Sequence, residues 1–197
     1  MRAFLAINLP SEERVRLHAA LAPLRALDLP VKWTQPESLH LTLKFLGNID
    51  ERRADAVKRI LEDVAKASDA FDMELGDIGA FPRLDHPRVW WVGIGGQPVL
   101  SRMQQDLERA LEKGGFARED RPFSPHVTIG HSRKGAERAA RRAHDVARSV
   151  AFRGRVRVNS IDLMESHLSR QGSRYERLLA AALRPSQASE SRKAEPR

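Results

Sequence analysis

The sequence contains no cysteine, and this absence excludes several classes of protein. Without thiols the chain cannot form disulfides, hold an iron–sulfur cluster or bind zinc through thiolates. It also lacks a long hydrophobic run, and no stretch approaches the roughly 20 apolar residues of a membrane-spanning helix. The opening stretch MRAFLAINLPSEERVR has only a short apolar segment before its charges begin, which is too short for a signal peptide. We therefore expect a cytoplasmic protein without membrane association.

What is present suits one globular domain with a basic surface. The chain has 197 residues, 41% of them hydrophobic, which is enough for a sizeable core. Lys and Arg number 34 against 26 Asp and Glu, so the formal net charge is +8. A basic surface favours a polyanionic partner such as RNA. Arginine-rich chains are also basic for reasons unrelated to binding, so charge alone does not identify the partner.

Hydrophobic periodicity and turn residues predict a mixture of strands and long helices. Strands are expected at 2–9, 31–34, 39–46, 71–77, 88–94, 126–130, 151–158 and 161–167, and helices at 11–27, 50–67, 98–113 and 135–148. Residues 175–183 fit either a strand or a helix. Antiparallel strands mixed with such helices indicate an α+β fold. Residues 1–183 are expected to form a single domain, and residues 184–197 a disordered tail with no large apolar side chain to bury.

Two similar tetrads carry the strongest functional signal in the chain. They are His-Leu-Thr-Leu at 40–43 and His-Val-Thr-Ile at 126–129. Alternate side chains of a strand share one face, so each histidine should lie beside the threonine two positions later, with the apolar residues facing a core. The tetrads begin 86 residues apart. We expect two pseudo-symmetric lobes of antiparallel sheet with helices on the outside, each lobe giving one His-x-Thr strand to a central cleft.

The chemistry of these four side chains fits phosphoryl transfer without a metal ion. Two imidazoles can act as acid and base near neutral pH, and two hydroxyls can hold the oxygens of a phosphate. A metal site is a poorer interpretation, because no carboxylate or third histidine lies at a suitable spacing beside either tetrad. We therefore predict catalytic roles for His40 and His126 and phosphate-binding roles for Thr42 and Thr128.

The tetrads and their surroundings resemble the 2H phosphoesterases, and among them the RNA 2′,3′-cyclic phosphodiesterases, also called 2′-5′ RNA ligases. The similarity extends from the first predicted strand to about Leu183. It is carried by MRAFLAINLP, by Trp33 and Pro36-Glu37 before HLTLKFLG, by Phe81-Pro82 before PRVWWVG, by SPHVTIG and by LMESHLSRQGSRYERL. One tetrad alone is a weak signal, whereas two in this order and context are specific.

The resemblance implies that the chain hydrolyses a 2′,3′-cyclic phosphate at an RNA end to a 2′-phosphate, with no cofactor. His40 would be the proton donor to the departing 3′ oxygen, and His126 the proton acceptor from water. The same site would join a cyclic phosphate end to a 5′-hydroxyl by the reverse reaction. A monomer that binds RNA or a nucleotide with a cyclic phosphate end is expected.

One position departs from the family pattern. Members carry an arginine five residues after the second motif histidine, where this chain has His131. On a straight strand that position faces away from the histidine, so His131 could reach the site only if Gly130 permits a bulge or a strand end. Arg133 is a second candidate for the contact to the substrate phosphate that the family's arginine makes. Phe45 is the matching position after the first tetrad, and is either a nucleoside contact or a core aromatic.

Two other functions remain open from the residues alone. The chain could be a non-catalytic RNA-binding module, although the intact pairs of histidine and threonine argue against it. It could also be a related enzyme acting on a small cyclic or 2′-5′-linked nucleotide. Substrate choice would then depend on the loops expected around residues 81–87 and 168–174.

Overall fold

The structure is a computed structural model that describes residues 1–133, 140–169 and 172–186. Its elements are β1 (Arg2–Asn8), α1 (Ser11–Ala20), α2 (Ala22–Arg25), β2 (Val31–Trp33), η1 (Pro36–Ser38), β3 (His40–Asn48), α3 (Glu51–Ala67), β4 (Phe71–Arg83), β5 (His86–Ile94), α4 (Pro98–Lys113), β6 (His126–Ser132), α5 (Ala140–Ser149), β7 (Gly154–Val158), β8 (Ser160–Ser169) and β9 (Gly172–Ala182). Within the described ranges, no helix is long and apolar enough to cross a membrane.

In the described residues all the strands belong to one antiparallel sheet of nine strands. Its order is β7-β4-β5-β6-β3-β1-β8-β9, and the short β2 pairs with β6 beside this path. The two strands that begin with the tetrads, β3 and β6, are therefore neighbours at the middle of the sheet. Three further strands extend outward from each of them. The two lobes expected from the sequence are thus two halves of a single sheet, and they meet at the tetrads.

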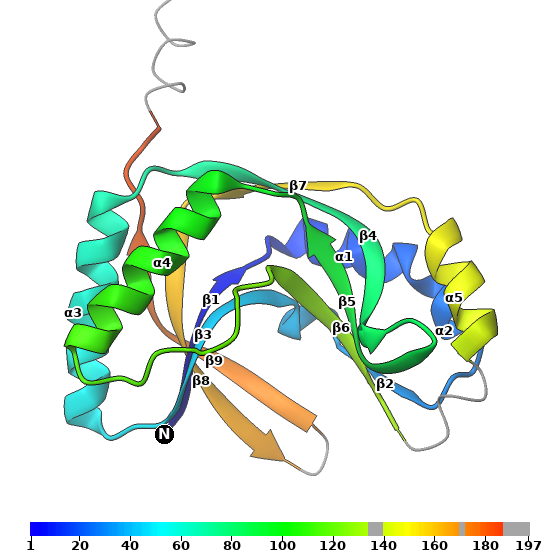
Figure 1. Cartoon of the computed structure of the whole chain (residues 1–197), viewed down its shortest axis with the longest axis horizontal. Helices are drawn as coiled ribbons and strands as arrows, with labels where there is room; N and C mark the ends of the chain where they lie inside the picture. The colour runs from blue at the N-terminus through cyan, green and yellow to red at the C-terminus, as the bar shows by residue number, and fades with distance from the viewer. Residues whose placement is uncertain (134–139, 170–171, 187–197) are drawn as a thin grey trace, which may run out of the picture.

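The helices cover both halves of this sheet (Figure 1). Helices α3 and α4 pack against each other, and α3 contacts β8 and β9. On the other half α5 contacts β4, and α1 contacts β7. One continuous hydrophobic core runs through both halves and includes Leu41, Leu43, Val127 and Ile129 of the tetrads. The apolar positions of both tetrads therefore face the core, as the alternation predicts, and the α+β class is confirmed.

Several predicted boundaries are wrong. The helix expected at 11–27 is divided into α1 and α2 by Leu21, with Pro23 at the start of the second piece. Ser11 lies inside the first turn, and Pro10 occupies the N-cap position. Asp50, the first residue of the helix expected at 50–67, is instead the N-cap of α3, because its side chain accepts a hydrogen bond from the Arg53 amide at 2.8 Å. The residues that cap the helix starts could therefore be predicted from the sequence only in part.

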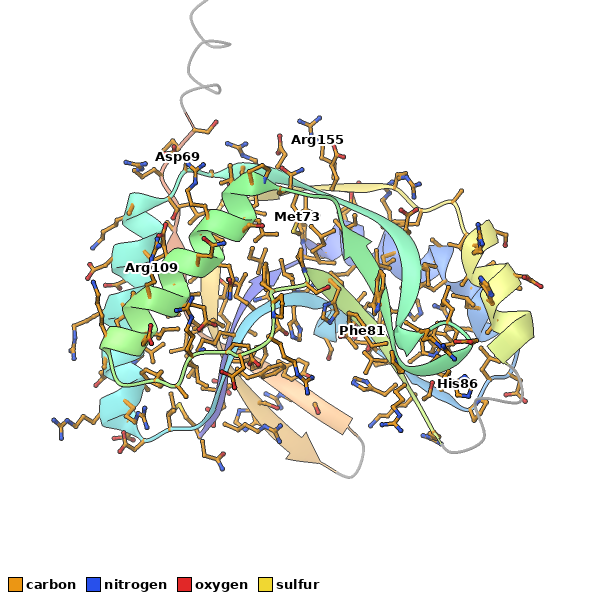
Figure 2. The ribbon with its side chains drawn as sticks, in the orientation of Figure 1. Asp69, Met73, Phe81, His86, Arg109 and Arg155 are labelled. Carbon is orange, nitrogen blue, oxygen red and sulfur yellow. The ribbon has the colours of Figure 1, made fainter. Side chains whose placement is uncertain are left out.

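The two loops assigned to substrate choice are largely hairpin strands. Residues 81–83 continue β4 and residues 86–87 begin β5, so the predicted loop narrows to a tight turn. Figure 2 shows His86 beside this turn and Phe81 nearer the middle of the molecule. Likewise, residues 168–169 and 172–174 belong to β8 and β9. The ambiguous segment at 175–183 is mostly β9, a strand.

Arg184, the first residue of the tail expected to be disordered, is held by the rest of the fold. The Arg184 amide donates to the Ser68 carbonyl at 2.9 Å, and its own carbonyl accepts from the Ala70 amide at 2.7 Å. Its guanidinium also pairs with Asp69 at 3.0 Å. Arg184 is therefore held against the end of α3 rather than being disordered. Residues 187–197, the remainder of the predicted tail, lie outside the described residues.

Candidate active site

The sheet register brings the two tetrads together. Leu41 of β3 is paired with Val127 of β6 in an antiparallel ladder. One step along this register in either direction places His40 across from Thr128 and Thr42 across from His126. Each histidine therefore lies diagonal to the other on the same face, at a separation of about 7–8 Å for such neighbours. This backbone spacing allows the two side chains to contact one phosphate between them.

A backbone carbonyl orients each imidazole in the same way. Nδ1 of His40 lies 2.8 Å from the Ser38 carbonyl oxygen, and Nδ1 of His126 lies 2.7 Å from the Ser124 carbonyl oxygen. A carbonyl only accepts hydrogen bonds, so both Nδ1 atoms carry the proton. In the neutral rings Nε2 is then the free base. At both histidines the carbonyl of the residue two positions earlier therefore fixes the same tautomer.

The two imidazoles also have matching aromatic neighbours. The ring of Tyr175 meets His40 edge to face, with 5.0 Å between centroids, and Phe81 meets His126 in the same manner at 5.0 Å. Phe4 lies 5.0 Å from the first ring and Trp91 lies 6.5 Å from the second. The pseudo-symmetry of the tetrads thus extends to their surroundings. Sequence reasoning gave none of these aromatic neighbours a role beside the histidines, although Tyr175 is the only tyrosine in the chain.

Beta-bulges turn the residues after the tetrads into the site. The pairing of β1 with β3 shifts by one residue between Thr42 and Lys44, and that of β5 with β6 shifts by one residue between Thr128 and Gly130. Each shift leaves the last residue of a tetrad unpaired and reverses the facing of the residues that follow. Phe45 and His131, five positions after the histidines, therefore face the same side as His40 and His126. The bulge that His131 required is present in β6, and β3 has one at the matching place.

A cavity of about 340 Å³ lies over this face of the sheet. Its lining includes His40, Thr42, Thr128, Phe45 and His131. His126 is not part of the lining, although the register places it directly across from Thr42. Arg133 is also outside the lining, and its side chain is exposed. Of the predicted substrate contacts, the structure therefore brings Phe45 and His131 to the cavity but not Arg133.

Burial sets the protonation of the histidines that line the cavity. It lowers the pKa of His40 from 6.5 to about 4, an effect that the bond to Ser38 opposes and the positive charge of Arg14 reinforces. Burial, and then the charge of Lys32, also lowers the pKa of His131. Both rings are therefore neutral near pH 7 without a ligand. A bound phosphate anion would raise both pKa values, because it stabilises the charged imidazolium.

The buried imidazole of His40 makes stability depend on pH. Its folded pKa of about 4 lies below the unfolded value of 6.5, so between these values the unfolded chain binds more protons. We expect the free energy of unfolding to fall by roughly 2–3 kcal/mol as the pH is lowered through this window, and to be unaffected by His40 above it. Urea denaturation across the window measures this. His40→Gln should lose that part of the pH dependence and His126→Gln should keep it; equal slopes in wild type and His40→Gln would contradict the assignment.

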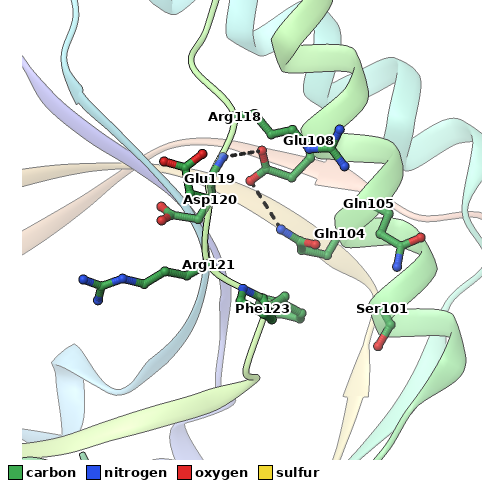
Figure 3. Close-up of a pocket in the computed structure, with 10 residues that line it drawn as sticks. Ser101, Gln104, Gln105, Glu108, Arg118, Glu119, Asp120, Arg121 and Phe123 are labelled. Carbon is green, nitrogen blue, oxygen red and sulfur yellow. Dashed lines mark hydrogen bonds between the residues drawn. The ribbon is translucent and has the colours of Figure 1, made fainter. Parts of the chain in front are cut away.

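A second and larger cavity lies between α4 and residues 118–123 (Figure 3). It measures about 600 Å³, and the Glu108 carboxylate is part of its wall. That carboxylate accepts hydrogen bonds from the Gln104 side chain at 3.3 Å and from the Glu119 amide at 3.4 Å. The cavity contains neither tetrad and, like the rest of the described chain, no cluster of three or more His, Asp or Glu side chains placed to hold a metal ion. The smaller cavity, which residues of both tetrads line, is therefore the candidate active site.

Comparison with known proteins points to one family. The family model described as the 2′-5′ RNA ligase superfamily matches residues 13–170. An RNA 2′,3′-cyclic phosphodiesterase of Aeropyrum pernix is 38% identical over 157 residues, which cover 76% of this chain and 85% of that protein. One of Archaeoglobus fulgidus is 32% identical over 181 residues, covering 90% of this chain and 98% of that protein.

Solved structures show the same fold. A protein of Thermus thermophilus superposes with a TM-score of 0.78 at 26% identity, covering 95% of this chain and all of that one. E. coli LigT in complex with 3′-AMP superposes with a TM-score of 0.71, also at 26% identity, covering 92% of this chain and 97% of that one. Together with the paired tetrads at the centre of the sheet, these similarities show that the chain belongs to the 2′-5′ RNA ligase superfamily of 2H phosphoesterases.

Proposed function

We propose that this protein hydrolyses 2′,3′-cyclic phosphate ends of RNA to 2′-phosphates by acid and base catalysis with His40 and His126. The observation that carries the proposal is the register of β3 with β6, which sets two identically oriented imidazoles diagonally across one face with a threonine opposite each. The names of the relatives, RNA 2′,3′-cyclic phosphodiesterases, supply the substrate class.

The chemistry requires one proton to be taken and one to be given. Nε2 of His126 takes a proton from water as the water oxygen bonds to phosphorus. The bond from phosphorus to the 3′ oxygen breaks, and Nε2 of His40 gives that oxygen a proton. The hydroxyls of Thr42 and Thr128 donate hydrogen bonds to the non-bridging oxygens, where charge increases in the transition state. Ring strain in the cyclic phosphate supplies the driving force.

The role of proton donor requires the substrate to charge His40. Its pKa of about 4 in the free protein leaves the ring neutral near pH 7. The phosphate anion raises this pKa when it binds. Binding of the substrate therefore protonates His40, which can then act as the proton donor. His40 can be charged while His126 is neutral, or the reverse. Both arrangements give the same bell-shaped dependence of the rate on pH. Residue-specific titration with bound phosphate therefore decides the order of the roles.

The remaining features of the cavity fit the nucleotide beyond the phosphate. Phe45 is 67% exposed and offers its ring to a nucleoside, and the His131 imidazole can donate to phosphate once charged. A 5′-hydroxyl can replace water as the nucleophile, which gives 2′-5′ ligation with the same roles: Nε2 of His126 takes the hydroxyl proton, and Nε2 of His40 gives a proton to the departing 3′ oxygen. All four tetrad residues come from one chain, which supports a monomeric enzyme. An RNA substrate supports a cytoplasmic location.

Turnover of a defined substrate tests the proposal. A nucleoside 2′,3′-cyclic phosphate is incubated with the full chain in excess chelator, and the product is identified by chromatography. We expect the 2′-phosphate alone and no loss of rate from the chelator. A nucleoside 3′,5′-cyclic phosphate, which lacks the strained five-membered ring, is the matched substrate control and should remain intact. Binding without turnover would indicate an RNA-binding module, and a rate that depends on added metal would contradict the mechanism.

A further inference from the structure

A chain of polar contacts lies behind His40 and ends at a buried carboxylate. Asn8 is the direct neighbour of His40 across the pairing of β1 with β3. Its amide nitrogen donates to Asp162 at 2.6 Å, and its amide oxygen accepts from the Arg14 guanidinium at 3.3 Å. Asp162 is 1% exposed and also accepts from the Ser160 hydroxyl at 3.0 Å. Because a carboxylate only accepts, the Asn8 amide has one orientation, with its oxygen toward Arg14.

Arg14 connects this network to the turn that orients the imidazole. Its guanidinium donates to the Glu37 carbonyl at 2.8 Å, within the single turn of η1. The next carbonyl, that of Ser38, accepts the proton on Nδ1 of His40 at 2.8 Å. On the other half of the sheet the carbonyl of Pro125, which lies between Ser124 and His126, accepts from the Ile94 amide at 3.3 Å. The β5 backbone thus contacts the segment just before His126, and a side chain contacts the turn before His40.

The charge of Arg14 also acts on His40. Burial is the main reason that the pKa of His40 is low, and Arg14 lowers it further. Other charged or titratable groups surround the ring: Glu37 beside Arg14, Arg2, His131 and Tyr175 in the cavity wall, and Asp162 with Arg177 behind Asn8. Arg14 is the member of this set that both touches the supporting turn and perturbs the ring.

We propose that Arg14 is a positioning residue for His40: by holding the Glu37 carbonyl it fixes the turn whose next carbonyl keeps the proton on Nδ1 and leaves Nε2 facing the cavity. The inference rests on the proposed function for its kinetic consequence only. Asn8 and Asp162 set the orientation of the guanidinium, and Arg14 does not touch the reacting atoms. Loss of Arg14 should therefore disturb the tautomer of one histidine and spare the other.

Two variants separate geometry from charge. Arg14→Gln removes both the forked contact and the positive charge, whereas Arg14→Lys keeps the charge but cannot contact the Glu37 carbonyl and Asn8 together. Arg16→Gln, two residues along α1 and exposed, is the matched control. The ¹⁵N chemical shifts of both imidazoles near pH 7 report which ring nitrogen carries the proton. Turnover of a 2′,3′-cyclic nucleotide gives kcat and KM.

We expect Arg14→Gln and Arg14→Lys to show a mixture of tautomers at His40, unchanged shifts at His126, and kcat lowered by roughly tenfold or more with little change in KM. The pKa of His40 should be higher in Arg14→Gln than in Arg14→Lys. If Arg14→Gln does not fold, Arg14→Lys carries the same tautomer test. Folded variants with wild-type shifts at His40 and kcat within twofold of wild type would overturn the inference. Absence of turnover in wild type would contradict the proposed function and leave the tautomer result standing.

Discussion

Replacement of either His40 or His126 should lower kcat/KM for a 2′,3′-cyclic nucleotide by about 10²–10⁴-fold, because a positioned acid or base contributes that much to proton transfer. His40→Ala and His126→Ala each remove one of the two proton carriers and leave the threonines in place. The double variant should be little worse than the single ones, since one transfer without the other completes no reaction. Steady-state rates at saturating and low substrate measure both effects.

The matched control for these variants is His86→Ala. His86 has the same side chain, is exposed and lies beside the turn between β4 and β5, away from the cavity. It should retain the wild-type rate. Circular dichroism and a thermal melt establish that each variant is folded. Losses below tenfold for both His40→Ala and His126→Ala would end the assignment of these residues as acid and base.

The centre of the site was predictable because it depends on strand alternation alone. A repeated His-x-Thr pattern with apolar residues between is readable from one sequence, and alternation assigns its faces without knowledge of the partner strand. The sequence also predicted that His131 would face the wrong way on a straight strand. It could not show where the strands bulge, because a bulge is fixed by pairing with neighbours far along the chain. Gly130 points to the reason: a side chain there would clash with Val31 and Trp33 of the adjoining β2.

The supporting contacts around His40 could not be predicted for the same reason. Arg14 precedes Glu37 by 23 residues, and Asn8 precedes Asp162 by 154. On a surface helix such as α1 an arginine is ordinarily a solvated side chain, and nothing in the local pattern distinguishes Arg14 from Arg16. Only the tertiary structure brings α1 beside η1. Sequence patterns predicted the two histidines and the two threonines, whereas the residues proposed to orient His40 required the fold.

The same limitation applies to Lys44, whose burial follows from the bulge beside it. Its ammonium lies 2.7 Å from the Glu108 carboxylate and 2.9 Å from the Ala117 carbonyl. The two side chains are only 5% and 9% exposed. The pair joins β3, two residues after Thr42, to α4 and to the segment that leads to the second tetrad. It therefore connects β3, which contains His40, to the segment that precedes His126.

Breaking this pair should be the most destabilising single change among the ion pairs of the described residues. Lys44→Met leaves the Glu108 carboxylate buried and unpaired, which costs about 3–5 kcal/mol in the free energy of unfolding. Lys44→Met combined with Glu108→Leu removes both charges and should recover most of that loss. Lys58→Met, which breaks the exposed pair with Asp55, is the matched control and should cost less than about 1 kcal/mol. Urea denaturation of the four proteins measures the differences, and equal effects of Lys44→Met and Lys58→Met would show that the buried pair contributes no more to stability than an exposed one.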